Sequence, residues 1–213
     1  MSLPFTHEQF LDVFGAYNST LWPFVGFIWL LTLGAVAHLY RRGAAASRVL
    51  AGVLAVHWMW SGVAYHLAYF RRVNPAAALF AGLFLLQAAL LLWRGVARPQ
   101  LSFTPSRTLW GIGGAALIAY ALIYPALGVL LGLAYPRLPT FGVPCPTTIL
   151  TAGTLLLVPR RQTLPVAVIP VLWSAVGGSA AFLLDIRADY ALLVACAALL
   201  IYVLIPRRDG GSA

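Results

Sequence analysis

Seven long apolar runs, separated by short stretches that hold most of the arginines, constrain this chain more than any other feature. An apolar run of about 20 residues is long enough to cross the hydrocarbon core of a bilayer as an α-helix. Of the 213 residues, 62% are hydrophobic and only 9% are charged, and the charges fall mainly at the edges of these runs. The pattern predicts an all-α integral membrane protein with about seven transmembrane helices.

The predicted spans form a single polytopic membrane domain over residues 1–206, followed by a cytoplasmic tail at 207–213. Ahead of the first span, Thr6 and Gln9 have the spacing of a helix capping box. We expect residues 1–18 to form a short amphipathic helix at the membrane interface. The spans lie at about 20–40, 49–70, 75–93, 108–133, 146–158, 164–184 and 190–206.

The arginines divide unevenly between the two sides of a seven-span arrangement. The chain contains 14 arginines and no lysine, and its formal net charge is +9. Positively charged loops are retained on the cytoplasmic side of a membrane, so we expect the N-terminus outside and the C-terminus in the cytoplasm. The cytoplasmic side receives Arg41, Arg42, Arg48, Arg94, Arg98, Arg107, Arg160, Arg161, Arg207 and Arg208, and the outer side receives Arg71, Arg72, Arg137 and Arg187.

The same distribution argues against two classes of function. The arginines sit as pairs between apolar spans instead of forming one basic face, so no nucleic-acid partner is predicted. A retinal Schiff base needs a lysine, and the chain contains none. Seven spans are therefore predicted without the chemistry of the rhodopsins.

The second span carries the densest cluster of polar and aromatic residues. His57 falls near the middle of this span, where an ionisable group is costly and often functional. Helical spacing places His57, Ser61 and Tyr65 on one face, and Trp58 and His66 on a neighbouring face. Two interpretations stay open for each histidine: part of a binding site, or a neutral side chain that has a structural role.

The fifth span begins with an irregular, proline-rich stretch. Proline removes a backbone donor, and a broken helix at membrane depth is tolerated only where it is buried in protein or faces a watery cavity. Thr147 and Thr151 then share one helix face, with Thr148 beside them. The segment is either a discontinuous substrate-binding helix, as in transporters, or a loop followed by a helix whose threonines bond their own carbonyls.

These patterns give a candidate binding site without a catalytic motif. No nucleophile, base and orienting group recur at a known spacing, so an enzyme is the less expected class and no catalytic residue is predicted. Gln87 in the third span and Trp173 in the sixth join the set, since they could line a cavity or equally well hold the helices together. The candidate substrate-binding residues are His57, Trp58, Ser61, Tyr65, His66, Gln87, Thr147, Thr148, Thr151 and Trp173.

Cysteines and histidines give only weak grounds for a metal or a cofactor. Cys145 and Cys196 are isolated and lack CxxC spacing, which favours buried free thiols over a disulfide or a soft-metal site. His38 and His57 could be axial haem ligands, but their depths in the membrane differ by roughly 9 Å at a helical rise of 1.5 Å per residue. No cofactor is predicted, and haem or a soft metal remains a minority interpretation.

Four stretches resemble a bacterial membrane family known as a domain of unknown function. Its members are sometimes labelled permeases. The resemblance extends over nearly the whole chain and implies a bacterial inner-membrane location, but it supplies no catalytic residue. The stretches are LPFTHEQFLDVFGAYNSTLWP, WMWSGVAYHLAYFRRVNPAAALFAGLFLLQA, FGVPCPTTIL and IPVLWSAVGGSAAFLLDIRADYALLVA.

The predicted function is binding or passage of a small solute through an outer-facing polar cavity, with the lipid bilayer as the main partner. The solute is not identified by the sequence. One alternative is a non-transporting subunit or anchor of a membrane complex, such as an electron-transfer complex, and a homo-oligomer also stays open. A cofactor- or metal-binding membrane enzyme is the third interpretation.

Overall fold

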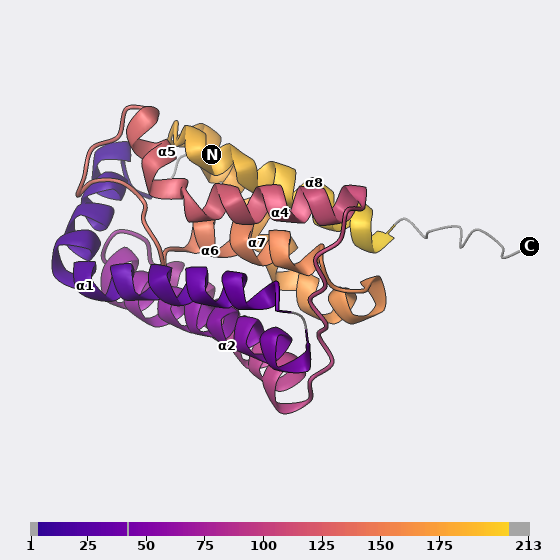
Figure 1. The fold of residues 1–213 in the computed structure, drawn as a ribbon. Helices are drawn as coiled ribbons and strands as arrows, with labels where there is room; N and C mark the ends of the chain where they lie inside the picture. Colours follow the sequence, from indigo (N-terminus) through magenta and orange to yellow (C-terminus); the bar gives the residue numbers. More distant parts are fainter. Residues whose placement is uncertain (1–3, 42, 205–213) are drawn as a thin grey trace, which may run out of the picture.

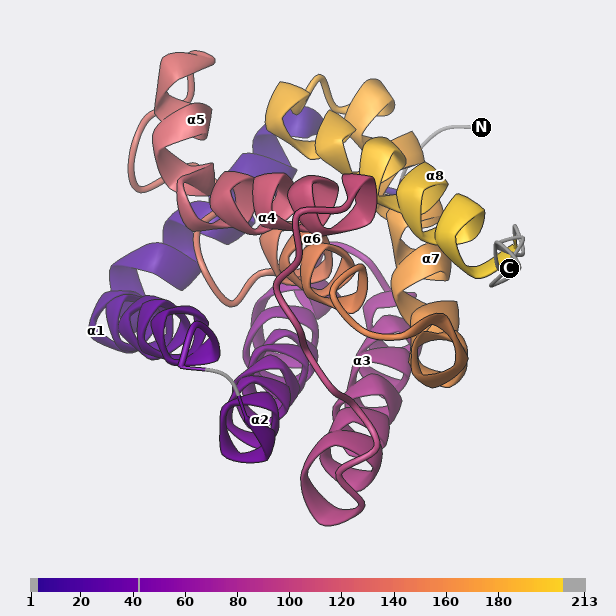
Figure 2. The same ribbon diagram turned by 45° about the vertical axis from the view of Figure 1, so that its right-hand side comes forward.

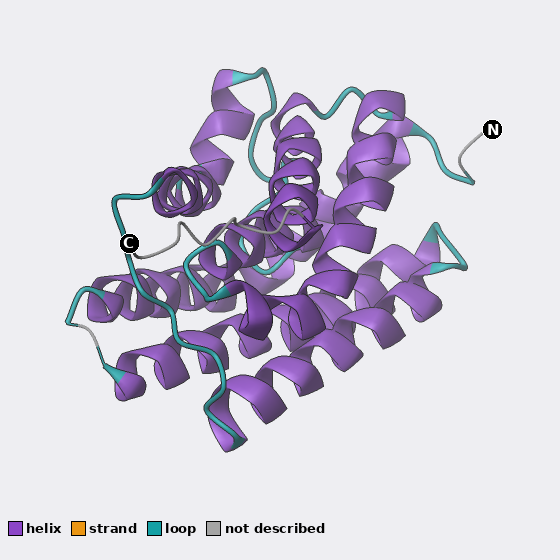
Figure 3. Cartoon of the chain, turned by 90° about the vertical axis from the view of Figure 1, so that its right-hand side faces the viewer, coloured by secondary structure: helices purple, strands orange, loops and turns teal. Residues whose placement is uncertain are grey.

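The described part of the chain is built from helices joined by short connections. The structure is a computed structural model that describes residues 4–41 and 43–204, and no strand occurs within these residues (Figure 3). The all-α prediction is confirmed. Residues 1–3 of the predicted interfacial helix, 205–206 of the last predicted span and the tail at 207–213 lie outside the described residues.

Most helices run side by side along one direction, and successive helices alternate in direction (Figure 1). Helix α4 packs on α6, α7 on α8, and α2 on α3. The helical segments are α1 (His7–Leu39), α2 (Ala44–Trp60), the π-helical η1 (Ser61–Tyr69), η2 (Phe70–Arg72), α3 (Ala77–Leu91), the π-helical η3 (Leu92–Ala97), α4 (Leu109–Leu122), α5 (Tyr124–Leu130), α6 (Pro144–Leu155), α7 (Arg160–Leu183), η4 (Arg187–Tyr190) and α8 (Ala191–Leu204).

Length and composition allow four of these segments to cross a membrane. They are His7–Leu39, Ala77–Ala97, Arg160–Leu183 and Arg187–Leu204, and the bent pair of α4 and α5 makes a fifth if it counts as one span. Several helices of this kind indicate a membrane protein. The predicted spans 49–70 and 146–158 are not in this set, because α2 passes into a segment rich in polar residues and α6 has only 12 residues.

Helix α1 is one continuous helix where the sequence predicted an interfacial helix followed by a span. Its capping box is confirmed, since Thr6 and Gln9 each bond the other's backbone. Figure 1 shows that α1 bends sharply partway along, so that its first part lies across the ends of other helices. Pro23 lies inside α1, and a proline removes a ladder hydrogen bond, which accounts for a bend near this position.

The first part of α1 is fastened to the connection between α5 and α6. The Asn18 side chain donates to the carbonyl oxygen of Leu138 over 2.8 Å. Arg137 in the same connection forms ion pairs with Glu8 at 2.5 Å and with Asp12 at 3.0 Å. These contacts hold the connection over one end of the bundle.

The predicted span 108–133 is broken into two helices that differ in direction by 67°. Helix α4 ends at Leu122, and Pro125 near the start of α5 cannot donate a backbone hydrogen bond. The indole nitrogen of Trp29 donates instead to the Leu122 carbonyl over 3.1 Å. The chain therefore breaks sharply at Ile123, just before Pro125, and one of the freed carbonyls is paired by a neighbouring helix.

Helix α6 is buried along its whole length, and Figure 2 shows it at the centre of the bundle. Its 12 residues extend about 18 Å at a rise of 1.5 Å per residue, which is well short of the roughly 30 Å of bilayer hydrocarbon. The short segments at both of its ends, 138–143 and 156–158, are also largely buried. Irregular backbone beside α6 is thus enclosed by protein, as the bilayer requires.

Two glycines set the distance between α4 and α6. A Cβ atom added at Gly114 would lie 2.6 Å from the carbonyl oxygen of Gly153, and one added at Gly153 would lie 2.8 Å from that of Gly114. Both contacts are shorter than real Cβ atoms allow, and the obstructing atoms are backbone. Small residues of this kind let membrane helices approach closely.

We expect Gly114→Ala to destabilise the protein by about 1–3 kcal/mol, because the added methyl group would push α4 away from α6. The matched control is Gly113→Ala on the same helix, where an added Cβ has no neighbour within 4 Å. This control should be neutral or stabilise the protein by up to about 1 kcal/mol. Thermal unfolding in detergent measures both, and equal effects would contradict the close α4–α6 contact.

Candidate functional site

The first group of predicted site residues forms hydrogen bonds between helices. One ring nitrogen of His57 (Nε2) lies 2.6 Å from the Thr32 hydroxyl, and the other (Nδ1) lies 3.4 Å from that of Thr147. Ser61 donates to the Gly142 carbonyl over 2.6 Å. These groups join α1, α2 and η1 to α6 and to the connection before it, and the Thr32, His57, Ser61 and Thr147 side chains are all buried. This geometry corresponds to the structural interpretation of His57.

The threonines of α6 are also paired within the protein. Thr151 donates to the Thr147 carbonyl and Thr148 to the Pro144 carbonyl, each over 2.8 Å. Thr151 in turn accepts the indole N–H of Trp58 over 2.8 Å. The threonines thus bond their own helix, which is the second of the two interpretations that the sequence left open.

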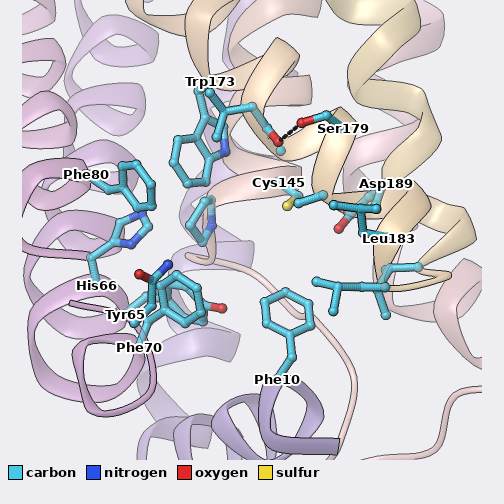
Figure 4. Close-up of a pocket in the computed structure, with 18 of the residues that line it drawn as sticks. Phe10, Tyr65, His66, Phe70, Phe80, Cys145, Trp173, Ser179, Leu183 and Asp189 are labelled. Carbon is cyan, nitrogen blue, oxygen red and sulfur yellow. Dashed lines mark hydrogen bonds between the residues drawn. The ribbon is translucent and has the colours of Figure 1, made fainter. Parts of the chain in front are cut away.

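A second group of predicted residues lines a cavity at one end of the bundle. The cavity has a volume of about 190 Å³ and lies between the first part of α1, η1, α7 and η4 (Figure 4). Tyr65, His66 and Trp173 from the predicted set line it, together with Cys145 at the start of α6. Tyr65 therefore lies with His66 and not with His57 and Ser61 as helical spacing predicted.

His66 is the most unusual side chain of this cavity. It is 0% exposed, and neither of its ring nitrogens has a hydrogen-bond partner among the described residues. Its ring centroid lies 4.8 Å from that of Phe84, 5.2 Å from that of Trp173 and 5.8 Å from that of Phe80. An unpaired buried polar group costs about 1–3 kcal/mol, so such a group calls for an explanation.

Trp173 adds a second unpaired group to the same cavity. Its indole nitrogen has no partner among the described residues, and the side chain is only 9% exposed. An uncharged imidazole offers one donor and one acceptor, and an indole offers one donor. His66 and Trp173 therefore both hold unpaired, buried nitrogens in the wall of one cavity.

The opposite wall carries a buried acid. Figure 4 shows Asp189 across the cavity from His66, with Cys145 between them. The Asp189 carboxylate accepts a hydrogen bond from the Tyr124 hydroxyl, and Cys145 lines the same cavity. Asp189 is only 2% exposed.

Sequence reasoning missed Asp189 and Tyr124 as parts of a site. Asp189 was not among the predicted site residues, although an acid at the start of an apolar span is a recognised functional signal. Tyr124 gave no such signal, because its partner comes from another part of the chain. The phenylalanines of the cavity, such as Phe10 and Phe70, also look like ordinary apolar residues in the sequence.

The remaining predicted residues lie away from the cavity. Gln87 donates to the Val166 carbonyl over 3.0 Å and connects α3 to α7. The Cys196 thiol lies 3.7 Å from the Val171 carbonyl, and both cysteines are free. Within the described residues, no group of three or more histidine, cysteine, aspartate or glutamate side chains could hold a metal ion.

A larger hollow of about 680 Å³ lies between α1 and α4 near the other end of the bundle. Apolar side chains from both helices line it, together with Arg107. No buried unpaired polar atom of the described residues faces this hollow. The cavity beside His66 is therefore the stronger candidate for a specific ligand site.

Exchanging His66 for phenylalanine should stabilise the ligand-free protein by about 1–3 kcal/mol. The substitution keeps a ring of similar size among aromatic neighbours and removes two unpaired nitrogens. The same exchange at His57 should destabilise the protein by about 1–3 kcal/mol, because it removes the ring nitrogens that pair with the Thr32 and Thr147 hydroxyls. Thermal unfolding of the two variants tests this contrast. A destabilised His66→Phe would show that protein groups pair the imidazole.

Comparison with known proteins gives a family and no activity. A model described as a family of unknown function (DUF6064) matches residues 7–211, so the chain belongs to this family. No curated protein and no solved structure matches the chain.

Proposed function

We propose that this member of the DUF6064 family is a membrane protein that binds a small solute in the cavity between α1, η1, α7 and η4. The observation that carries the proposal is His66, which is fully buried and unpaired beside this cavity. Binding a polar atom of a solute would satisfy the imidazole and offset the cost of its burial.

The size of the cavity limits the solute. A volume of 190 Å³ corresponds to the liquid volume of roughly six water molecules, and drug-sized ligands occupy pockets of about 300–1,000 Å³. The lining is mostly aromatic and aliphatic, with a few polar groups. A small, largely apolar solute with one or two hydrogen-bonding groups fits these limits better than a sugar or a nucleotide.

The proposal includes seven spans in a bacterial inner membrane, with the N-terminus outside and the C-terminus in the cytoplasm. The uneven distribution of arginines supports this orientation. The alternating helices of the bundle support the span count, provided that the protein around α6 completes a pass that its 12 residues cannot make alone. In this orientation the cavity opens near the outer end of the bundle.

A non-transporting anchor in a membrane complex is the main alternative. Trp22 is 63% exposed and Trp93 is 52% exposed, and such residues could mark a partner surface. Tryptophan is also enriched where a helix meets the membrane interface, so these two do not favour a partner over lipid. Solute binding is preferred because an anchor does not need an unpaired histidine beside a cavity.

Filling the cavity should abolish solute binding. Ala180 of α7 is half-buried and lines the cavity, so Ala180→Phe would place a ring in it. Ala175 on the same helix is exposed and does not line the cavity, so Ala175→Phe is the matched control. The measurement is thermal unfolding of the protein in lipid nanodiscs with a panel of small alcohols, phenols, amines, quaternary ammonium ions and carboxylates.

At a solute concentration 100 times its Kd, binding should stabilise the native protein by about 2.7 kcal/mol. Ala175→Phe should keep this shift and Ala180→Phe should lose it. The proposal fails if no member of the panel shifts the wild-type protein, or if Ala180→Phe responds like the control.

The orientation can be tested with reporters fused to the C-terminus in a bacterial host. A green fluorescent protein fusion should fluoresce, because this reporter folds in the cytoplasm. An alkaline phosphatase fusion should be inactive, because this enzyme requires the oxidising exterior. The reverse pattern would place the arginine-rich loops outside and contradict the proposed orientation.

A further inference from the structure

The walls of the cavity beside His66 are largely aromatic faces and edges. The rings of Phe10, Phe14, Tyr65, Phe70, Phe80 and Trp173 line it, and they come from α1, η1, η2, α3 and α7. The rings contact one another: Phe80 and Trp173 have centroids 5.2 Å apart, and Phe10 and Phe14 have centroids 4.8 Å apart. Aromatic rings that enclose a small space attract cations through their negative faces.

Asp189 supplies a negative group to the same space. It lines the cavity and accepts a hydrogen bond from the Tyr124 hydroxyl. An ionised carboxylate is an acceptor only, and the Tyr124 hydroxyl directed at it matches that form. Within the described residues, Asp189 has no ion pair. A buried carboxylate without a cationic partner leaves room for a cationic ligand.

The cavity lacks the groups that bind anions. The chain contains no lysine, and no arginine lines the cavity in the described part of the structure. Helix α6 begins at the cavity, but Pro144 and Pro146 occupy its first and third positions and have no backbone N–H to donate. The start of α6 therefore lacks most of the donors that let a helix N-terminus hold an anion.

The unpaired nitrogens of His66 and Trp173 can form hydrogen bonds with a second, uncharged part of a ligand. Figure 4 shows His66 and Asp189 on opposite sides of the cavity. Both nitrogens of the imidazole and the indole N–H are unpaired. A hydroxyl group can donate to the imidazole and accept from the indole, while an ammonium group lies near Asp189 and the rings.

From these observations we infer that the solute is a small organic cation, of the amino-alcohol or quaternary-ammonium class, with its charge beside Asp189 and the aromatic rings. The inference rests on the proposed solute-binding function and narrows it to one class of ligand. A ligand of this class accounts together for the Asp189 carboxylate, the aromatic lining and the unpaired nitrogens of His66 and Trp173.

The test compares three probes that have nearly the same shape: choline, its uncharged carbon isostere dimethylbutanol, and the anion dimethylbutanoate. Binding to the full-length protein in nanodiscs is measured by calorimetry, and the quenching of tryptophan fluorescence serves as a second readout because Trp173 lines the cavity. Choline should bind about tenfold or more tightly than dimethylbutanol, and the anion should bind most weakly.

Substitution of Asp189 tests whether its carboxylate causes the preference for choline over dimethylbutanol. Asp189→Asn should weaken choline binding about tenfold and leave dimethylbutanol binding unchanged, so the neutral probe also reports that the variant is folded. If this variant does not fold, Phe80→Leu takes its place and should reduce the preference for choline through the loss of one aromatic face.

The outcomes separate this inference from the proposed function. Equal or tighter binding of the neutral isostere overturns the cation inference and leaves a solute site in place. If only other neutral members of the solute panel bind, the cation inference is likewise overturned and the solute site stays in place. Failure of every solute to bind overturns the proposed function and the cation inference together.

Discussion

The burial of α6 is the constraint on which the rest of the structure depends. A 12-residue helix cannot reach across a bilayer, so the backbone at its ends must be enclosed by protein. The close contact of Gly114 with Gly153 brings α4 against α6. The surrounding helices then exclude lipid from the buried backbone, and the proline-rich start of α6 lies at the inner wall of the cavity.

Some polar side chains in this interior have hydrogen-bond partners in the protein, and others have none. Those between α2 and α6, such as His57 and Thr151, are paired and fix how the helices pack. His66, only nine positions after His57, is unpaired beside the cavity. Because an unpaired buried imidazole is costly, we attribute the presence of His66 beside the cavity to ligand binding.

The sequence predicted the helical class, the capping box at Thr6 and the irregular start of α6, because these follow from local composition and spacing. It did not predict that α1 is continuous, because Pro23 bends a helix without ending it. It also placed Tyr65 with Ser61, since regular helical spacing does not hold in the π-helical η1. The pairing of Asp189 with Tyr124 depends on tertiary packing and leaves no local pattern.

The central claim is that a ligand satisfies His66, and a high-resolution map of the protein extracted with its native lipids tests it most directly. The account predicts density in the cavity that belongs to no protein atom and lies about 3 Å from a nitrogen of the His66 ring. A collapsed cavity filled by its own side chains, or a His66 ring that bonds a protein carbonyl, would contradict it.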